Sequence, residues 1–304
     1  MSAAPESPNR IESLGPTMRG LLWMALSGLC FALLNGASRV LTEDLHSWQV
    51  QCLRYFFGGL VMLPLILRAG AAAFRTNHLS LQIWRNVVHT VGTGFWFLAL
   101  PMVPLAEVTA IGFTGPIFMT LGAMLFLGEV VRWRRWLAIG LGFLGVTIVL
   151  WPKLSLGVGA SVGSLLLLAA APVSAASFLM AKVLTRRDSP EAIVFWQCLL
   201  VSLFTLPAAL WFWQPVEWRH IAILVFVGAM GSSGHYALNR ALKVAEVSAV
   251  QPARFLELVW AALVGFVIWT DLPSAWTVAG AAVIFGATTY IARREAIAER
   301  ATRR

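Results

Sequence analysis

The chain has 304 residues, of which 59% are hydrophobic and only 12% charged, and its formal net charge is +9. A typical soluble domain has about 25% charged residues, so a soluble globule of this size could not bury so much apolar surface. The composition argues against a secreted disulfide scaffold, a coiled coil, a disordered chain and a free nucleic-acid-binding protein, and it predicts several crossings of a lipid bilayer.

Apolar runs of about 20 residues, separated by charged residues or by Pro and Gly, predict ten membrane-spanning helices. In chain order we expect them near 19–42, 48–68, 80–100, 105–128, 133–151, 161–183, 191–213, 219–241, 246–269 and 274–292. The predicted fold class is therefore all-α integral membrane.

Lys and Arg predict the orientation of these spans. Most of the 23 Lys and Arg residues lie in connections on one side of the predicted membrane, the side that also holds both termini. Because cytoplasmic loops carry the excess of Lys and Arg, we expect a multi-pass protein of the cell inner membrane with both termini cytoplasmic. The basic end from Arg293 to Arg304 is interpreted as a stop-transfer tail rather than a nucleic-acid or anionic-lipid patch.

Short stretches recur in order about 140 residues later, which is typical of an internal repeat. Residues 38–42 recur at 181–185, 63–64 at 206–207, 106–111 at 245–250, and Trp136 with Gly140 as Trp276 with Gly280. Because each half would hold five spans, an odd number, the second half enters the membrane from the opposite face. The sequence thus predicts two five-helix inverted-topology repeats, an arrangement typical of transporters.

These expectations divide the chain into five parts. We expect a cytoplasmic N-terminal tail at 1–18, a first five-helix repeat at 19–151, an external linker at 152–160, a second repeat at 161–292 and a basic cytoplasmic tail at 293–304.

Three stretches resemble a known family. They are Leu53-Arg54-Tyr55-Phe56, Leu127-Gly128-Glu129, and residues 252–261, which read Pro-Ala-Arg-Phe-Leu-Glu-Leu-Val-Trp-Ala. Together with the two halves, they resemble the EamA family of the drug/metabolite transporter superfamily. This resemblance implies ten helices around a central cavity, alternating access, and transport of a small organic metabolite. The third stretch is similar to the subgroup that includes bacterial S-adenosylmethionine uptake carriers.

Charged side chains within the spans are candidates for function, because a charge near the bilayer centre costs about 2.5–3.5 kcal/mol on insertion scales. Glu257 lies near the middle of the ninth span, and Arg254 lies one turn earlier on the same face. The two could simply neutralise each other. Alternatively, they present opposite charges to a cavity, which would suit a zwitterion or a cationic amino acid derivative.

His89 and Arg85 share one face of the third span, which lipid would not tolerate. We treat both as candidate substrate-binding residues, with an interhelical hydrogen bond from His89 as the alternative. Glu257 and His89 are also the candidates for proton coupling, because both are titratable side chains that lie near the predicted midplane, where burial can shift their protonation. Tyr236 is a weaker candidate for the same cavity.

Three residues are interpreted as structural or gating elements. Arg54, near the start of the second span, is expected to make a conformation-dependent salt bridge or a tie to a carbonyl rather than to contact substrate. Pro116 and Pro252 interrupt the fourth and ninth spans at corresponding places in the two halves. Such paired interruptions indicate a transport site, although ordinary kinks are the alternative.

Two deep tryptophans, Trp96 and Trp260, either stack on a substrate ring or fill the bundle.

Two stretches match known motifs, 140–145 (G-x-G-x-x-G) and 159–163 (G-x-S-x-G), but neither follows the strand that such motifs need. We therefore assign the glycines of the first stretch to close helix packing. The sequence has no Walker A motif, no H-E-x-x-H and no paired C-x-x-C, so it predicts no cofactor, no metal site and no ATP-driven step.

The leading hypothesis is a secondary transporter that moves a small polar metabolite, most plausibly an amino acid or a derivative such as S-adenosylmethionine. The chain is not expected to be an enzyme. The alternatives are an intramembrane enzyme or lipid flippase acting on a head group, a vitamin or nucleobase carrier, and a partner-binding membrane subunit. The sequence leaves open the substrate, the direction, the driving ion, and whether the chain is a monomer or a homodimer.

Overall fold

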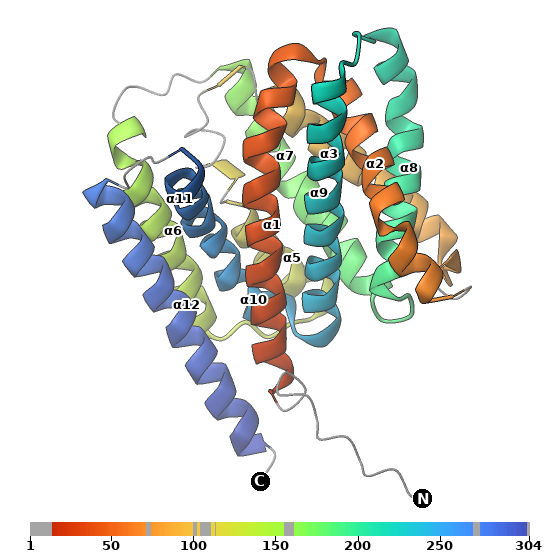
Figure 1. Ribbon diagram of the computed structural model, residues 1–304. Coiled ribbons are helices and arrows are strands. Elements are labelled where there is room, and N and C mark those ends of the chain that lie inside the picture. Colours follow the sequence, from red (N-terminus) through yellow and green to blue (C-terminus); the bar gives the residue numbers. More distant parts are fainter. Residues whose placement is uncertain are drawn as a thin grey trace, which may run out of the picture.

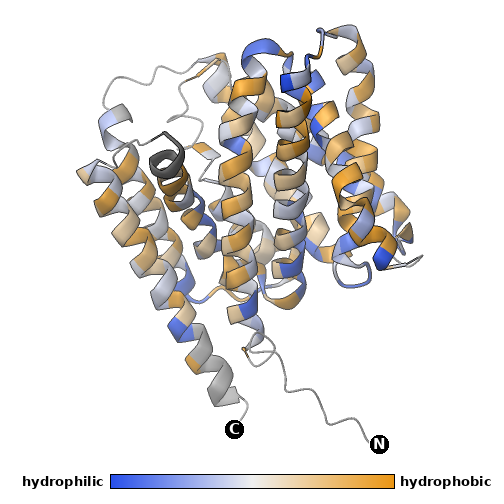
Figure 2. Cartoon of the chain, in the orientation of Figure 1, coloured by the Kyte–Doolittle hydropathy of each residue, from blue (hydrophilic) through white to orange (hydrophobic). Residues whose placement is uncertain are grey.

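The computed structural model describes residues 14–70, 74–99, 102–103, 111–112, 114–154, 161–269 and 274–302. Within these ranges the chain is a bundle of helices with no strand, and the first and last described residues lie at the same end of the bundle (Figure 1). Apolar residues dominate the helices along most of their length (Figure 2). The predicted all-α fold is confirmed.

The helices follow the predicted spans closely. They are α1 (Pro16–Asp44), α2 (Ser47–Arg68), α3 (Leu79–Ala99), α5 (Gly115–Leu127), α6 (Trp133–Leu154), α7 (Val162–Leu184), α8 (Pro190–Trp211), α9 (Trp218–Val244), α10 (Val247–Val250), η2 (Gln251–Phe255), α11 (Leu256–Trp269) and α12 (Ala275–Thr302). Among the described residues, seven segments are long and apolar enough to span a membrane, and α5 is a shorter apolar helix. Together with α3 and α6, they make up the ten predicted spans.

Local sequence explains several helix ends. Ser161 and Ser189 cap α7 and α8 by accepting hydrogen bonds from the backbone N–H groups of Ser164 and Ala192, at 3.2 and 3.1 Å. Gly128 ends α5 with φ of 69°, a left-handed conformation that glycine adopts without steric cost. These residues keep the connections short, so that consecutive spans run in opposite directions.

Both predicted proline interruptions lie at helix breaks. In the ninth span, Pro252 belongs to η2, a 3-10 turn that separates the four-residue α10 from α11. In the fourth span the break differs from the expectation of a kink near the middle of the helix. Pro116 lies in the first turn of α5, where a missing N–H costs little, and Thr114 before it is in a turn.

The packing of the helices has the symmetry of the predicted repeat. α1 packs along α9 while α3 packs along α7, and these two pairs exchange when the halves are exchanged. α2 packs along α8 and α6 along α12, so each of these spans contacts its own copy. The fold therefore consists of two five-helix halves related by a pseudo-two-fold axis, as an inverted repeat requires.

Glycines permit the closest of these approaches. A Cβ added to Gly145 of α6 would come within 2.9 Å of the carbonyl oxygen of Gly280 in α12, and one added to Gly280 within 2.4 Å of the carbonyl of Gly145. The assignment of the 140–145 glycines to helix packing is thus supported at Gly145, because small residues let helix backbones approach in membranes.

Candidate functional site

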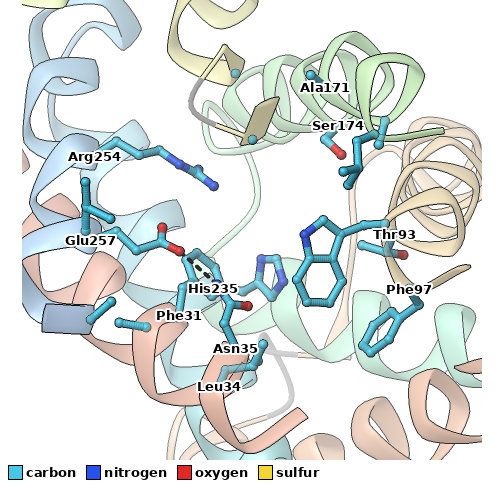
Figure 3. A pocket seen from close by; sticks show the side chains of 18 of the residues that line it. Phe31, Leu34, Asn35, Thr93, Phe97, Ala171, Ser174, His235, Arg254 and Glu257 are labelled. Carbon is cyan, nitrogen blue, oxygen red and sulfur yellow. Dashed lines mark hydrogen bonds between the residues drawn. The ribbon is translucent and has the colours of Figure 1, made fainter. Parts of the chain in front are cut away.

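A cavity of about 560 Å³ lies between the two halves. Its lining comes mainly from α1, α3, α5, α7, η2 and α11, and Figure 3 shows side chains from several of these elements converging on it. The volume is within the usual range for a small-molecule site, about 300–1,000 Å³. The sequence placed its candidate substrate-binding residues on the third, eighth and ninth spans, so α1 and α7 are additional walls.

Within the described residues, the lining of the cavity extends to one end of the bundle. Its lining residues extend from Phe31 to the exposed Glu43 near the end of α1, and from His89 to Phe97 near the end of α3. We call this end, where α1 and α3 finish, the open end, and the other the closed end. The cavity thus runs from the middle of the bundle to the open end, the upper end in Figure 1.

Arg254 and Glu257, two candidate substrate-binding residues from the sequence, line one wall of the cavity. The Glu257 carboxylate accepts a hydrogen bond from Asn35 Nδ2 of α1 at 3.0 Å (Figure 3). The Arg254 guanidinium lies 5.7 Å from the Phe31 ring centroid and 5.2 Å from that of Phe178. Among the described residues, no carboxylate lies within 4 Å of this guanidinium. Mutual neutralisation through a direct ion pair therefore does not describe these two groups.

His89 lines the cavity, but the protein occupies both of its ring nitrogens. Nε2 lies 2.6 Å from the Tyr55 hydroxyl and 2.9 Å from Gln197 Nε2, while Nδ1 lies 3.2 Å from the Ser177 hydroxyl. These contacts favour the interhelical hydrogen-bonding role for His89. Arg85 is completely buried beside this network, where it donates to Gln197 Oε1 at 2.8 Å, and it is not a lining residue.

The two tryptophan candidates have different surroundings. Trp96 lines the cavity, next to Phe97. Trp260 is not a lining residue, and its indole N–H donates to the carbonyl oxygen of Ala25 in α1 at 3.0 Å. Stacking on a ligand thus remains a prediction for Trp96, whereas the bundle-filling alternative describes Trp260.

Tyr236 also lies away from the cavity. Its hydroxyl donates to the Glu191 carboxylate at 3.0 Å, and its ring packs edge-on against Trp23. The preceding residue, His235, does line the cavity. Adjacent residues on a helix point about 100° apart, so His235 can face the cavity while Tyr236 faces Trp23 and Glu191.

Several polar lining residues lay outside the sequence predictions. Among them are Asn35, Thr93, Ser174 and Gln251. Each is an uncharged polar residue within a predicted span, a pattern that many non-lining residues share. Gln251 lies directly before Pro252, at the helix break, and is completely buried.

Hydrogen bonds tie the elements together at the closed end. The Glu129 carboxylate accepts the backbone N–H groups of Val247 and Ser248 at 2.8 and 3.0 Å and the Ser248 hydroxyl at 2.8 Å. Arg135 donates to the Ser248 hydroxyl at 2.8 Å and pairs with Glu246. Lys182 of α7 donates to two backbone carbonyls at the end of α9. The contacts of Glu129 and Arg135 join the two halves below the cavity, and those of Lys182 tie two helices of the second half together.

A second tie at this end surrounds Asp188, in the connection between α7 and α8. Its carboxylate accepts hydrogen bonds from the backbone and side chain of Asn77, from Thr76 and from Gln82. Burial alone would raise the pKa of Asp188, but these hydrogen bonds outweigh burial and hold the pKa below its ordinary value.

Among the described residues, no group of three or more His, Cys, Asp or Glu side chains could hold a metal ion. The polar groups of the cavity are instead two guanidiniums, carboxylates, imidazoles and amides. This arrangement can bind charged and hydrogen-bonding groups of an organic molecule.

Comparison with known proteins gives matches over nearly the whole chain. The model of the EamA-like transporter family matches residues 18–151 and 161–293. A riboflavin transporter of Rhizobium johnstonii is 35% identical over 92% of this chain and 93% of its own length. An S-adenosylmethionine uptake transporter of Rickettsia prowazekii is 28% identical over 92% of this chain and 94% of its own length. One solved structure has a TM-score of 0.76 at 19% identity, covering 90% of this chain and 98% of its own.

Proposed function

Because the chain belongs to the EamA-like transporter family, we propose that it carries a small polar organic metabolite across the inner membrane by alternating access. We place both termini in the cytoplasm and keep the predicted parts, with tails at 1–18 and 293–304, repeats at 19–151 and 161–292 and an external linker at 152–160. The closed end of the bundle is then the cytoplasmic end. The observation that carries this proposal is the cavity, which is charged at mid-bundle and whose described lining residues extend to one end of the bundle.

The chemistry of the cavity supports an amino acid or an amino acid derivative as substrate. Arg254 offers a guanidinium for a carboxylate, and Glu257, one turn away, offers a carboxylate for a cationic group. Phe31 and Phe178 provide apolar contact beside them. S-Adenosylmethionine, the substrate in the name of the Rickettsia relative, carries both charges together with an aromatic base.

A vitamin such as riboflavin is the second candidate. It is supported by the riboflavin transporter of Rhizobium johnstonii, at 35% identity, and by Trp96, whose indole lines the cavity. A flat, largely uncharged ring system would depend on stacking against aromatic side chains more than on Arg254 and Glu257.

Alternating access is supported by the ties at the closed end. Glu129, Arg135 and Lys182 hold α10 and the end of α9 through side-chain hydrogen bonds. Such bonds can break without unfolding either five-helix half, so a rocking motion would open this end while the opposite end closes around the same site.

The test uses the purified full-length protein in two assays. A thermal-shift screen of metabolites that includes S-adenosylmethionine and riboflavin identifies ligands that bind the folded state and raise its apparent stability. Uptake of the radiolabelled hit into proteoliposomes then tests transport. Arg254→Ala should lose binding of a charged hit, whereas Arg68→Gln, an exposed arginine on α2, should behave as wild type. A ligand that is bound and chemically converted, rather than accumulated, would contradict the proposal.

A further inference from the structure

Arg54 lies in α2 with only 5% of its surface exposed, and it lines the cavity. Its guanidinium carbon is 4.4 Å from the Tyr55 ring centroid and 5.8 Å from that of Phe97. On a third side it contacts α9, because a Cβ on Gly231 would come within 3.3 Å of Arg54 Nε. The aromatic rings and this close helix approach hold the side chain in place.

The polar groups of Arg54 are not used by the protein itself. Within the described ranges, no hydrogen-bond acceptor and no carboxylate engages its guanidinium. Arg85 is a structural arginine by comparison, since it is completely buried and donates to Gln197 Oε1 at 2.8 Å. A salt bridge or carbonyl tie, the role expected for Arg54 from the sequence, is absent among these residues.

The deep part of the cavity therefore contains unequal charge. Two guanidiniums, those of Arg54 and Arg254, face it together with one carboxylate, that of Glu257; the remaining carboxylate of the lining, Glu43, is exposed at the open end. An uncompensated charge within a membrane is costly, so a ligand that supplies the missing negative charge would be bound favourably.

We propose that Arg54 is a substrate-contacting residue that binds an anionic oxygen group, either a carboxylate or a phosphate. Phe97, which borders Arg54, lies across the cavity from Arg254 and Glu257 (Figure 3). The planar guanidinium fork matches two oxygens of either group, and aromatic neighbours restrict it without using its N–H donors. The proposal rests on the proposed transport function, because it assigns the anionic part of a metabolite held in the same cavity.

The first experiment tests the anion site without assuming any metabolite. Full-length protein in nanodiscs is titrated with sodium acetate and with sodium phosphate, at ionic strength held constant with chloride, and the thermal shift is recorded. Arg54→Gln should weaken the apparent affinity at least about tenfold, and Arg54→Lys, which keeps the charge but not the fork, should weaken it less. Arg68→Gln, at the exposed end of the same helix, is the matched control and should not differ from wild type.

The second experiment identifies the source of the anion. Binding of S-adenosylmethionine is compared with that of its decarboxylated form, and binding of riboflavin with that of riboflavin 5′-phosphate. For whichever pair the wild type binds, we expect it to prefer the compound that carries the additional carboxylate or phosphate. Arg54→Gln should lose this preference, and its affinity for the compound without that group should equal that of the wild type.

Three outcomes would separate the possibilities. Wild-type protein that gains no stability from either anion, or Arg54→Gln protein that gains as much as wild type, overturns the proposal. Equal weakening of both members of a pair assigns Arg54 a purely structural role and also overturns it. An Arg54-dependent anion response without transport of any of the four metabolites would instead contradict the substrate classes of the proposed function and leave the Arg54 site supported.

Discussion

Replacing Glu129 with alanine should loosen the closed end of the bundle. The substitution removes the acceptor of three hydrogen bonds, from two backbone N–H groups of α10 and from the Ser248 hydroxyl. Hydrogen bonds to a charged group contribute about 1.5–3 kcal/mol each, but Glu129 is only half-buried and water replaces part of the loss. We therefore expect the free energy of opening at this end to fall by about 2–3 kcal/mol.

The assay is hydrogen–deuterium exchange of the segment 247–255 in nanodiscs. When closing is faster than exchange, the exchange rate is proportional to the open fraction, so the expected change is about 30- to 160-fold. Glu217→Ala, which removes an exposed carboxylate at the opposite end of the bundle, is the control and should leave this segment unchanged. Unaltered exchange in Glu129→Ala would refute the view that these bonds hold the end closed.

Three further predictions concern other parts of the molecule. Gly145→Val would place methyl groups against Gly280 and should destabilise the protein by about 1–3 kcal/mol. The measurement is the Tm in detergent, which should fall. An unchanged Tm would contradict the close approach of α6 and α12. Because the folded pKa of Asp188 lies below its ordinary value of 3.8, its stabilising contribution is complete above that value and is lost as pH falls through the folded pKa. Wild type should therefore exceed Asp188→Asn in Tm at pH 7, and a gap that does not shrink on strong acidification would count against this assignment. If Glu257 couples transport to protons, Glu257→Gln should abolish accumulation driven by a pH gradient in liposomes while substrate exchange continues; wild-type uptake that ignores the gradient would remove the coupling hypothesis.

The architecture was predictable because the bilayer imposes a length. A span needs about 20 apolar residues, so ten apolar runs predicted ten spans. Because each repeat holds an odd number of spans, the second repeat was predicted to be inverted. The structure of the breaks was less predictable. A proline shows where a helix loses an N–H, but it does not show whether the result is a 3-10 turn, as at Pro252, or a new helix start, as at Pro116.

The sequence could predict which residues of the candidate site lie deep in the membrane, but not which way each side chain faces. Arg254, Glu257, His89 and Trp96 were found because polar or aromatic groups near the midplane are unusual, and all four line the cavity. Tyr236 lies on the same helix as the lining residue His235 but faces Trp23 and Glu191, and a single sequence does not fix this rotation without knowing the neighbouring helices.

The contact between α2 and α8 pairs each span with its own copy, yet the two copies differ at its most polar position. Arg54 in the first half corresponds to Gln197 in the second, and the two have unlike partners. Under the proposed alternating access, a perfectly symmetric carrier would have two access states that are equivalent by the two-fold axis, and both would hold the cargo equally tightly. The charge of Arg54 belongs to one half only, so the outward-facing and inward-facing states would surround the cargo with different groups. The fold thus allows the affinities at the two membrane faces to differ, which a symmetric frame alone would not provide.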